Sequence, residues 1–151
     1  RVRVEGLPDE FYVKSMRMED QDVLDGGLNL AYGASGALRI VLSDRAGVVS
    51  GVVSDEDGNP VTGATAVLVP EAAARQGNDL FYRNANTDQQ GRFRLTSVHP
   101  GEYKLYAWDG IEAMAWLDPY VLEPYRAKAT SVRLAESERS ETNLTVIPLA
   151  N

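Results

Sequence analysis

The single histidine of the chain is the first residue whose type is suited to catalysis. His99 and Glu102 form the pattern H-x-x-E, which opens the zinc-binding motif of some metallopeptidases. A catalytic zinc ion needs about three protein ligands and an open position, but the sequence offers no second histidine and no cysteine. The same shortage removes Ser-His-Asp catalysis, unless folding brings His99 to a serine and an acid. The pattern at this proline–glycine turn is therefore interpreted as a coincidence, and no enzyme is predicted.

Two groups of acidic residues are the next candidates. Asp55, Asp57 and Asn59 alternate as the opening of a calcium loop does, and oxygen ligands suit a hard cation. The later bidentate glutamate is missing, and Asp, Gly and Asn are also the ordinary residues of a tight turn. These residues are kept as a calcium candidate only, and no other metal or cofactor is predicted. The acids of Glu19–Asp22 resemble a glycosidase pair, but a solvated face explains them as well.

The segment Tyr106–Tyr125 has the most unusual composition, because it contains both tryptophans of the chain. Aromatic rings beside carboxylates stack on sugars and anchor protein interfaces. Alternatively, the tryptophans pin a long connection onto the domain, because large aromatic side chains dominate core energetics. Both interpretations stay open. The candidate ligand-binding residues are Tyr106, Trp108, Trp116, Tyr120 and Tyr125.

Composition limits the class of partner. The 151 residues carry a net charge of −7, with an isoelectric point near 4.7. Phosphate binding needs a surplus of Lys and Arg, so no nucleic-acid partner is expected. The absence of cysteine excludes disulfides, thiolate metal sites and cysteine nucleophiles. No apolar run approaches the roughly 18 residues that span a bilayer, so no membrane insertion is predicted.

The apolar pattern predicts an all-β fold. Short alternating segments rich in β-branched residues are interrupted by turn residues, which is typical of a sandwich or barrel. Val49, Gly51 and Val53 share one face of their strand, and Gly51 indicates a bulge or a close backbone approach. The expected strands are 1–4, 11–18, 37–42, 48–54, 63–69, 92–95, 103–108, 131–134 and 142–149. The expected core residues include Phe93, Leu95, Val98, Tyr103 and Leu105.

Two segments interrupt the β pattern. Asp118-Pro119 is typical of an N-cap followed by proline at the first helical position, which predicts one short helix near 119–129. Pro124 limits that helix, because an interior proline removes a hydrogen bond. Helix-forming residues at 71–74 predict a turn or two.

An internal echo divides the chain. The segment 1–15 is similar in pattern to 92–107, and the strand at 37–43 is similar to 143–149. Repeats of this kind predict that 1–44 is the C-terminal part of one β-sandwich module and that 46–151 is a complete second one. The alternative is that any two β-meanders look alike at this level.

Four motifs in the second module occur in a characteristic order. They are V-x-G-x-V-x-D at 49–55, G-x-P-V-x-G-A at 58–64, T-D-x-x-G-x-F at 87–93 and P-G-E-Y-x-L at 100–105. Together they resemble the carboxypeptidase regulatory-like domain, over about residues 46–150. The resemblance implies an immunoglobulin- or transthyretin-like antiparallel β-sandwich that acts as a folding, spacing or docking module. It does not imply peptidase activity.

A sister group of pilin and adhesin sandwiches forms an isopeptide bond between lysine and asparagine beside a catalytic acid. The acid of that group would fall at Ala107 here. No isopeptide bond is therefore expected.

These observations predict a structural or domain-presenting module of a larger protein, secreted, periplasmic or on the cell surface of a bacterium. Its expected partners are neighbouring domains of the same polypeptide. One alternative is a carbohydrate- or protein-binding module that uses residues 106–125. A second alternative is self-association through strand edges left open by a truncated 1–44 module.

Overall fold

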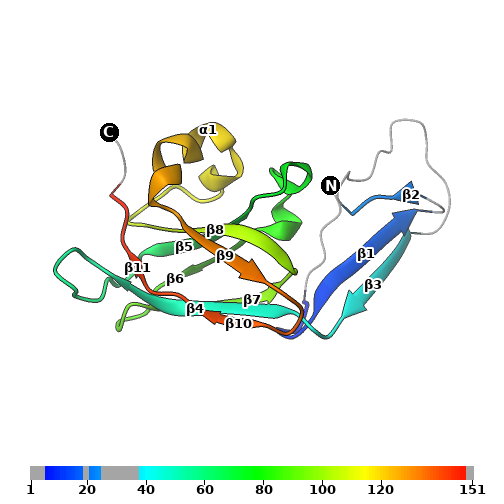
Figure 1. Ribbon diagram of the computed structural model, residues 1–151, viewed down its shortest axis with the longest axis horizontal. Helices are drawn as coiled ribbons and strands as arrows, with labels where there is room; N and C mark the ends of the chain where they lie inside the picture. Colours follow the sequence, from blue (N-terminus) through cyan, green and yellow to red (C-terminus); the bar gives the residue numbers. More distant parts are fainter. Residues whose placement is uncertain (1–5, 19–20, 25–37, 149–151) are drawn as a thin grey trace.

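A computed structural model describes residues 6–18, 21–24 and 38–148 of the chain. They form a two-sheet β-sandwich with a separate small sheet beside it (Figure 1). The predicted all-β sandwich with one short helix is confirmed. No helix among the described residues is long and apolar enough to cross a membrane.

One sheet of the sandwich is organised around strand β4. β4 (Gly47–Ser54) pairs antiparallel with β7 (Arg92–Val98) on one side. On its other side it pairs in parallel with two short strands, β10 (Arg139–Glu141) and β11 (Leu144–Thr145). The sheet is therefore mixed, where the sequence predicted antiparallel pairing throughout.

The second sheet has the order β6-β5-β8-β9 and is antiparallel. Its strands are β5 (Thr65–Pro70), β6 (Arg83–Asn86), β8 (Gly101–Trp108) and β9 (Thr130–Leu134). The expectation missed β6 because its sequence, R-N-A-N, lacks apolar alternation. Pairing with β5, at a register that sets Ala66 opposite Ala85, makes it a strand.

The space between the two sheets holds the main core. Because successive side chains of a strand point to opposite faces, every second residue of β4, β7 and β8 enters this core. All five expected core residues are buried, as are Val49 and Val53. The buried members are Val49, Val53, Ala64, Ala66, Leu68, Phe93, Leu95, Val98, Tyr103, Leu105, Ala107, Val132, Leu134 and Leu144.

A helical connection between β8 and β9 covers the outer face of the second sheet (Figure 1). It consists of η3 (Ala115–Leu117), α1 (Pro119–Leu122) and η4 (Glu123–Lys128). Asp118 caps α1 by accepting a hydrogen bond from the Tyr120 amide, as expected. The α-helix ends before Pro124 and continues as a 3₁₀ helix, because proline cannot donate the next helical hydrogen bond. Between β5 and β6, the turns η1 (Ala73–Arg75) and η2 (Asp79–Phe81) replace the expected turn at 71–74.

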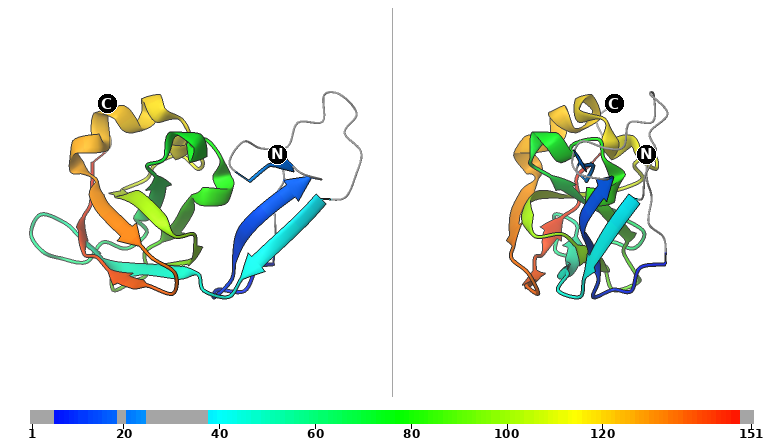
Figure 2. Two further views of the ribbon diagram at one scale, coloured as in Figure 1. Left: turned by 45° about the vertical axis from the view of Figure 1, so that its right-hand side comes forward. Right: turned by 90° about the vertical axis from the view of Figure 1, so that its right-hand side faces the viewer.

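The N-terminal sheet has the order β2-β1-β3 and extends to one side of the sandwich (Figure 2). β1 (Tyr12–Met18) pairs antiparallel with β3 (Leu38–Ser43) and with the two-residue β2 (Gln21–Asp22). The expected strand at 1–4 lies outside the described residues. The two segments of similar sequence, 37–43 and 143–149, pair differently with their neighbours. β3 is antiparallel to β1, whereas Ile147 makes a parallel bridge to Trp108.

The expected strand at 142–149 is wrong in its bounds. The chain forms β10 and β11 instead, with Thr142 and Asn143 between them. The Thr142 amide donates to the Ser50 carbonyl at 2.7 Å, and the Asn143 carboxamide accepts from the Val52 amide at 3.2 Å. This close crossing lies directly over Gly51, where a Cβ atom would overlap the Thr142 carbonyl. The expected close backbone approach at Gly51 is confirmed.

We expect Gly51→Ala to destabilise the sandwich by about 3 kcal/mol, the upper end of the cost of overpacking, because the obstructing atoms belong to the backbone. Ser54→Ala, on the same strand, is the matched control and should change stability by less than about 0.5 kcal/mol. Urea denaturation of both variants measures the difference. Equal stability of the two variants would contradict the close-approach interpretation.

Candidate functional site

The structure places most of the aromatic candidate residues in a second core, between the outer face of β8 and the helical connection. Tyr106 is 2% exposed, Trp108 0%, Trp116 3% and Tyr125 7%. Tyr120 is the exception, at 89%. The structure therefore brings four of the five candidates together, but in the interior and without Tyr120.

The packing of these rings explains their burial. Tyr106 and Trp108 lie two residues apart on β8, and their rings stack at 4.8 Å with an interplanar angle of 8°. Tyr125 of η4 meets Trp108 edge-on at 5.6 Å. A sugar cannot stack on a ring that the protein already covers. This arrangement matches the other interpretation of the segment, in which the tryptophans pin the connection to the sandwich.

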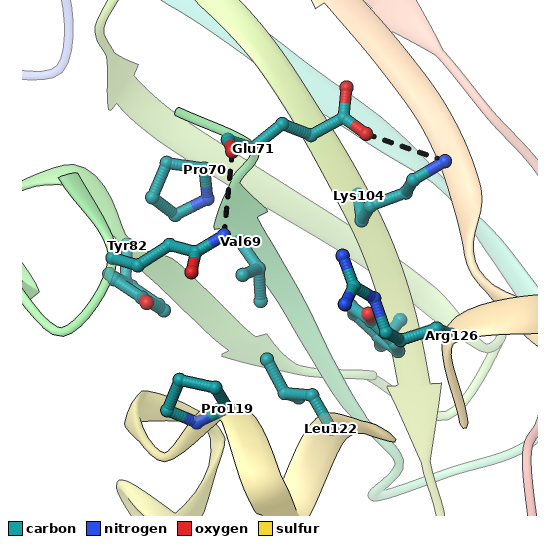
Figure 3. Close-up of a pocket in the computed structure, with 10 residues that line it drawn as sticks. Val69, Pro70, Glu71, Tyr82, Lys104, Pro119, Leu122 and Arg126 are labelled. Carbon is teal, nitrogen blue, oxygen red and sulfur yellow. Dashed lines mark hydrogen bonds and ion pairs between the residues drawn. The ribbon is translucent and has the colours of Figure 1, made fainter. Parts of the chain in front are cut away.

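A small pocket opens at one edge of this aromatic core (Figure 3). Its floor is apolar and includes Val69, Tyr82, Tyr106 and Leu122. Its cavity volume is about 40 Å³. A water molecule needs at least about 10–15 Å³ of such space, whereas pockets for small organic ligands measure about 300–1,000 Å³. The pocket therefore has room for a few water molecules and not for an enclosed sugar ring.

Charged side chains surround the mouth of this pocket. Lys104 forms an ion pair with Glu71 at 3.4 Å and donates to the Ser131 hydroxyl at 2.7 Å. Arg126 reaches over the pocket from η4, as Figure 3 shows. Burial raises the pKa of the Tyr106 hydroxyl, and Arg126 partly offsets that effect. This neutral hydroxyl and the rim charges offer hydrogen bonds, but they include no activated nucleophile.

Most of this pocket could not be predicted from the sequence. Glu71 follows β5, Tyr82 lies between η2 and β6, and Lys104 lies on β8, and each is an ordinary residue in its own segment. The pairing of β5 with both β6 and β8 places them around one opening.

The calcium candidate is organised as a turn. The Asp55 carboxylate accepts hydrogen bonds from the amides of Asp57 and Asn59, each at 2.9 Å. Gly58 adopts a φ of 85°, which a glycine tolerates without strain. Among the described residues, no group of three or more His, Cys, Asp or Glu side chains is placed to hold a metal ion. Of the Glu19–Asp22 acids, the first two lie outside the described residues, and Asp22 accepts from the Leu24 amide at 2.9 Å.

His99 and Glu102 diverge in the structure. The Glu102 side chain is exposed on β8, whereas His99 is 3% exposed and lies under the N-terminal sheet. The Nε2 atom of His99 is 2.7 Å from the Val13 carbonyl oxygen. The H-x-x-E pattern therefore does not form a joint ligand pair, and its histidine belongs to a contact between two parts of the chain.

The position expected for an isopeptide acid is also apolar in its surroundings. Ala107 is 1% exposed and lies in the main core, whose buried members are all apolar or tyrosine. The buried polar residues among those the structure describes are Asn78, Thr87, Ser97 and His99, and they include neither a lysine nor an acid.

Residues 48–112 match the family described as carboxypeptidase regulatory-like domain. The match confirms the resemblance that the four motifs carry, and it covers the sandwich from β4 to the start of the helical connection. No curated protein sequence matches the chain.

Several solved structures are similar to the chain at low sequence identity. The TIE protein of Bacillus anthracis is 16% identical, with 72% of this chain and 19% of that chain covered and a TM-score of 0.44. The major pilin subunit of Bacillus cereus is 13% identical, with 72% and 31% covered and a TM-score of 0.45. The 5-hydroxyisourate hydrolase of Klebsiella pneumoniae is 22% identical, with 70% and 92% covered and a TM-score of 0.37. The chain thus spans less than a third of the length of the first two.

We expect Trp116→Ala to destabilise the protein by about 3–5 kcal/mol, as the truncation of a buried tryptophan does. Tyr120→Ala is the matched control from the same segment and should change stability by less than about 0.5 kcal/mol, because its side chain is exposed. Chemical denaturation followed by circular dichroism measures both. A Trp116→Ala variant of unchanged stability would favour the binding interpretation of these aromatics.

Proposed function

We propose that the chain is a non-catalytic structural module that holds and presents a neighbouring unit within a larger exported or cell-envelope protein. The observation that carries this proposal is the contact between the N-terminal sheet and the sandwich. We call this contact the junction. It is formed by residues 8–18 and 21–24 on one side and by Ala46, 78–81, 94–99 and Glu136 on the other.

Apolar side chains form the centre of the junction. Phe81, from η2 of the sandwich, is 1% exposed and packs among Val13, Met16, Val23 and Leu24 of the N-terminal sheet. Among the described residues, Phe81 is the one fully buried member of this cluster that comes from the sandwich, and the partly buried Leu80 packs against the same cluster. A three-stranded sheet needs an apolar face packed on something to be stable.

Backbone hydrogen bonds fix the orientation of the two parts. The Ser97 amide donates to the Asp9 carbonyl, and the Ala46 amide donates to the Glu10 carbonyl, each at 3.0 Å. The buried carboxamide of Asn78 donates to the Leu24 carbonyl at 3.2 Å. Directional bonds at several separate points resist rotation in a way that apolar contact alone does not. The junction therefore behaves as a rigid connection.

The surface supports an additional ion pair at the same place. Arg94 of β7 lies 3.2 Å from the Asp9 carboxylate. Both side chains are more than half exposed, so this pair contributes little to stability. The pair instead helps to orient the N-terminal sheet relative to the sandwich.

We also propose a division of the chain into two domains on the basis of this contact. Residues 1–44 would be the end of a preceding sandwich, and 46–151 the unit to which it is anchored. The connection between them is short, and its Arg45 carbonyl accepts a hydrogen bond from the Ser137 amide at 2.8 Å. An acidic chain without cysteine and with a regulatory-like domain suits a bacterial surface or periplasmic protein, with neighbouring domains as partners.

Self-association is the second candidate function, and the exposure of β3 favours it. β3 lies at the edge of the N-terminal sheet, and its Ile40, Val41 and Leu42 are 38%, 41% and 44% exposed. Exposed apolar edge strands invite pairing with another chain. A second copy of the chain could add its own β3 at this edge.

The rigid junction predicts a narrow distance distribution across it. The chain has no native cysteine, so Val41→Cys and Gln90→Cys provide unique spin-label sites on β3 and on the exposed turn before β7. We expect one narrow distance by double electron–electron resonance at pH 7.5. Phe81→Ala should broaden it, because this truncation removes the centre of the junction at a cost of about 3–5 kcal/mol. Tyr120→Ala, far from the junction, is the control, and a broad distribution in the unmodified background would contradict the proposal.

The β3 edge predicts a separate outcome. If the chain self-associates there, light scattering after size-exclusion chromatography should report a dimer that Val41→Lys converts to a monomer, because edge lysines block strand addition. A matched Thr145→Lys change, at an exposed position of the sandwich, should leave the dimer intact. A monomer in both backgrounds would remove self-association as a function.

A further inference from the structure

His99 is built into the junction from the sandwich side. His99 follows β7 in the chain. Its imidazole ring lies between two aromatic rings from different parts of the chain. The Tyr12 ring of β1 meets it edge-on at 5.0 Å, and the Phe81 ring meets it at 4.7 Å. With 3% exposure, the imidazole is enclosed as long as β1 stays in place.

The hydrogen bond of His99 determines its protonation state. A carbonyl oxygen only accepts, so the Nε2 atom that lies 2.7 Å from the Val13 oxygen must carry the hydrogen. The Nδ1 atom is then bare, and it is buried without a hydrogen-bond partner among the described residues. A proton added to Nδ1 would find no acceptor there.

The charges nearest to the ring are also positive. Arg83 of β6 is held in place by the carbonyls of Leu80, Tyr82, Thr96 and Ser97 at 2.7–3.1 Å. The Arg75 guanidinium lies over the Phe81 ring at 4.3 Å.

Other titratable groups around the junction do not reverse this balance. Tyr12 of β1 directs its hydroxyl at Glu136, and the Tyr103 hydroxyl of β8 donates to the His99 carbonyl. Burial lowers the pKa of Arg83, and the negative charge of Asp79 in η2 acts in the opposite direction and so favours the charged guanidinium.

We propose that the junction is an acid-sensitive clamp, in which protonation of His99 releases the N-terminal sheet from the sandwich. An imidazolium in this position would be a third cation beside two arginines, desolvated and with an unpaired N–H group. Withdrawal of β1 removes Tyr12 and Val13 from the ring and exposes it to water. The protonated ring is therefore more stable in the open junction than in the closed one.

The pKa of His99 gives the direction and the range of this effect. Burial, followed by the positive charge of Arg83, lowers the pKa from 6.5 to about 3. A group whose pKa is lower in the closed state favours closure fully above the pKa of the open state. Closure is therefore strongest above pH 6.5 and weakens as the pH falls from 6.5 towards 3. Between those limits the equilibrium constant for closing falls about tenfold per pH unit. At pH 5 it is about 30-fold smaller than at high pH.

This inference rests on the junction proposed above, and the experiment separates the two. The Val41→Cys/Gln90→Cys spin-label pair is measured in the full chain at pH 7.5, 6.0 and 4.5. A broad distribution already at pH 7.5 overturns the rigid junction itself. A narrow distribution at every pH overturns the clamp alone. A distribution that is narrow at pH 7.5 and broadens towards pH 4.5 is the expected result.

His99→Gln assigns the effect to this residue, because glutamine keeps an N–H donor but does not titrate. The variant should hold the junction closed at pH 4.5, and persistent broadening would overturn the assignment. If the variant does not fold, the wild-type histidine answers the question, because it is the only one in the chain and its ring resonances are unambiguous. NMR titration should then find its pKa well below 6.5 while the junction is closed, and a value near 6.5 would overturn the clamp.

Discussion

Burial of the sheet β6-β5-β8-β9 on both faces is the constraint on which the rest of the structure depends. The inner face of β8 contributes Tyr103 and Leu105 to the sandwich core, and its outer face contributes Tyr106 and Trp108 to the second core. A sheet with two apolar faces cannot leave one of them in water, so a covering layer is required. The helical connection supplies it, which explains why Trp116 and Tyr125 pack inwards.

The same requirement for cover explains the junction. Phe81 projects from the segment between β5 and β6, and it becomes buried only when the N-terminal sheet packs against it. The polar groups enclosed with it are paired, as the four carbonyl contacts of Arg83 show. Nδ1 of His99 is an exception, and a buried polar atom without a partner costs free energy. In the proposed acid-sensitive clamp, this cost makes the closed junction easier to open.

The filled interior also shapes the functional conclusion. The two cores are occupied by the chain's own side chains, and the pocket at their edge holds only about 40 Å³. The described surface also carries one anchored neighbour, the N-terminal sheet, and one exposed strand edge, β3. Both features concern contacts between protein segments, and the proposed connecting module rests on them.

The sequence by itself determined the features that depend on local spacing. Alternation predicted β4, β7 and β8 and their core residues, Asp118-Pro119 predicted the helix start, and four ordered motifs carried the resemblance to the carboxypeptidase regulatory-like domain. Polar β6 and the replacement of the expected strand at 142–149 by β10 and β11 could not be predicted, because pairing with β5 and the crossing over Gly51 decide them. The burial of Trp116 and the enclosure of His99 depend on residues distant in the chain, with Val13 86 positions before the histidine. Only the tertiary structure decided which of these side chains meet water, because exposure is a property of the assembled layers and not of the local sequence.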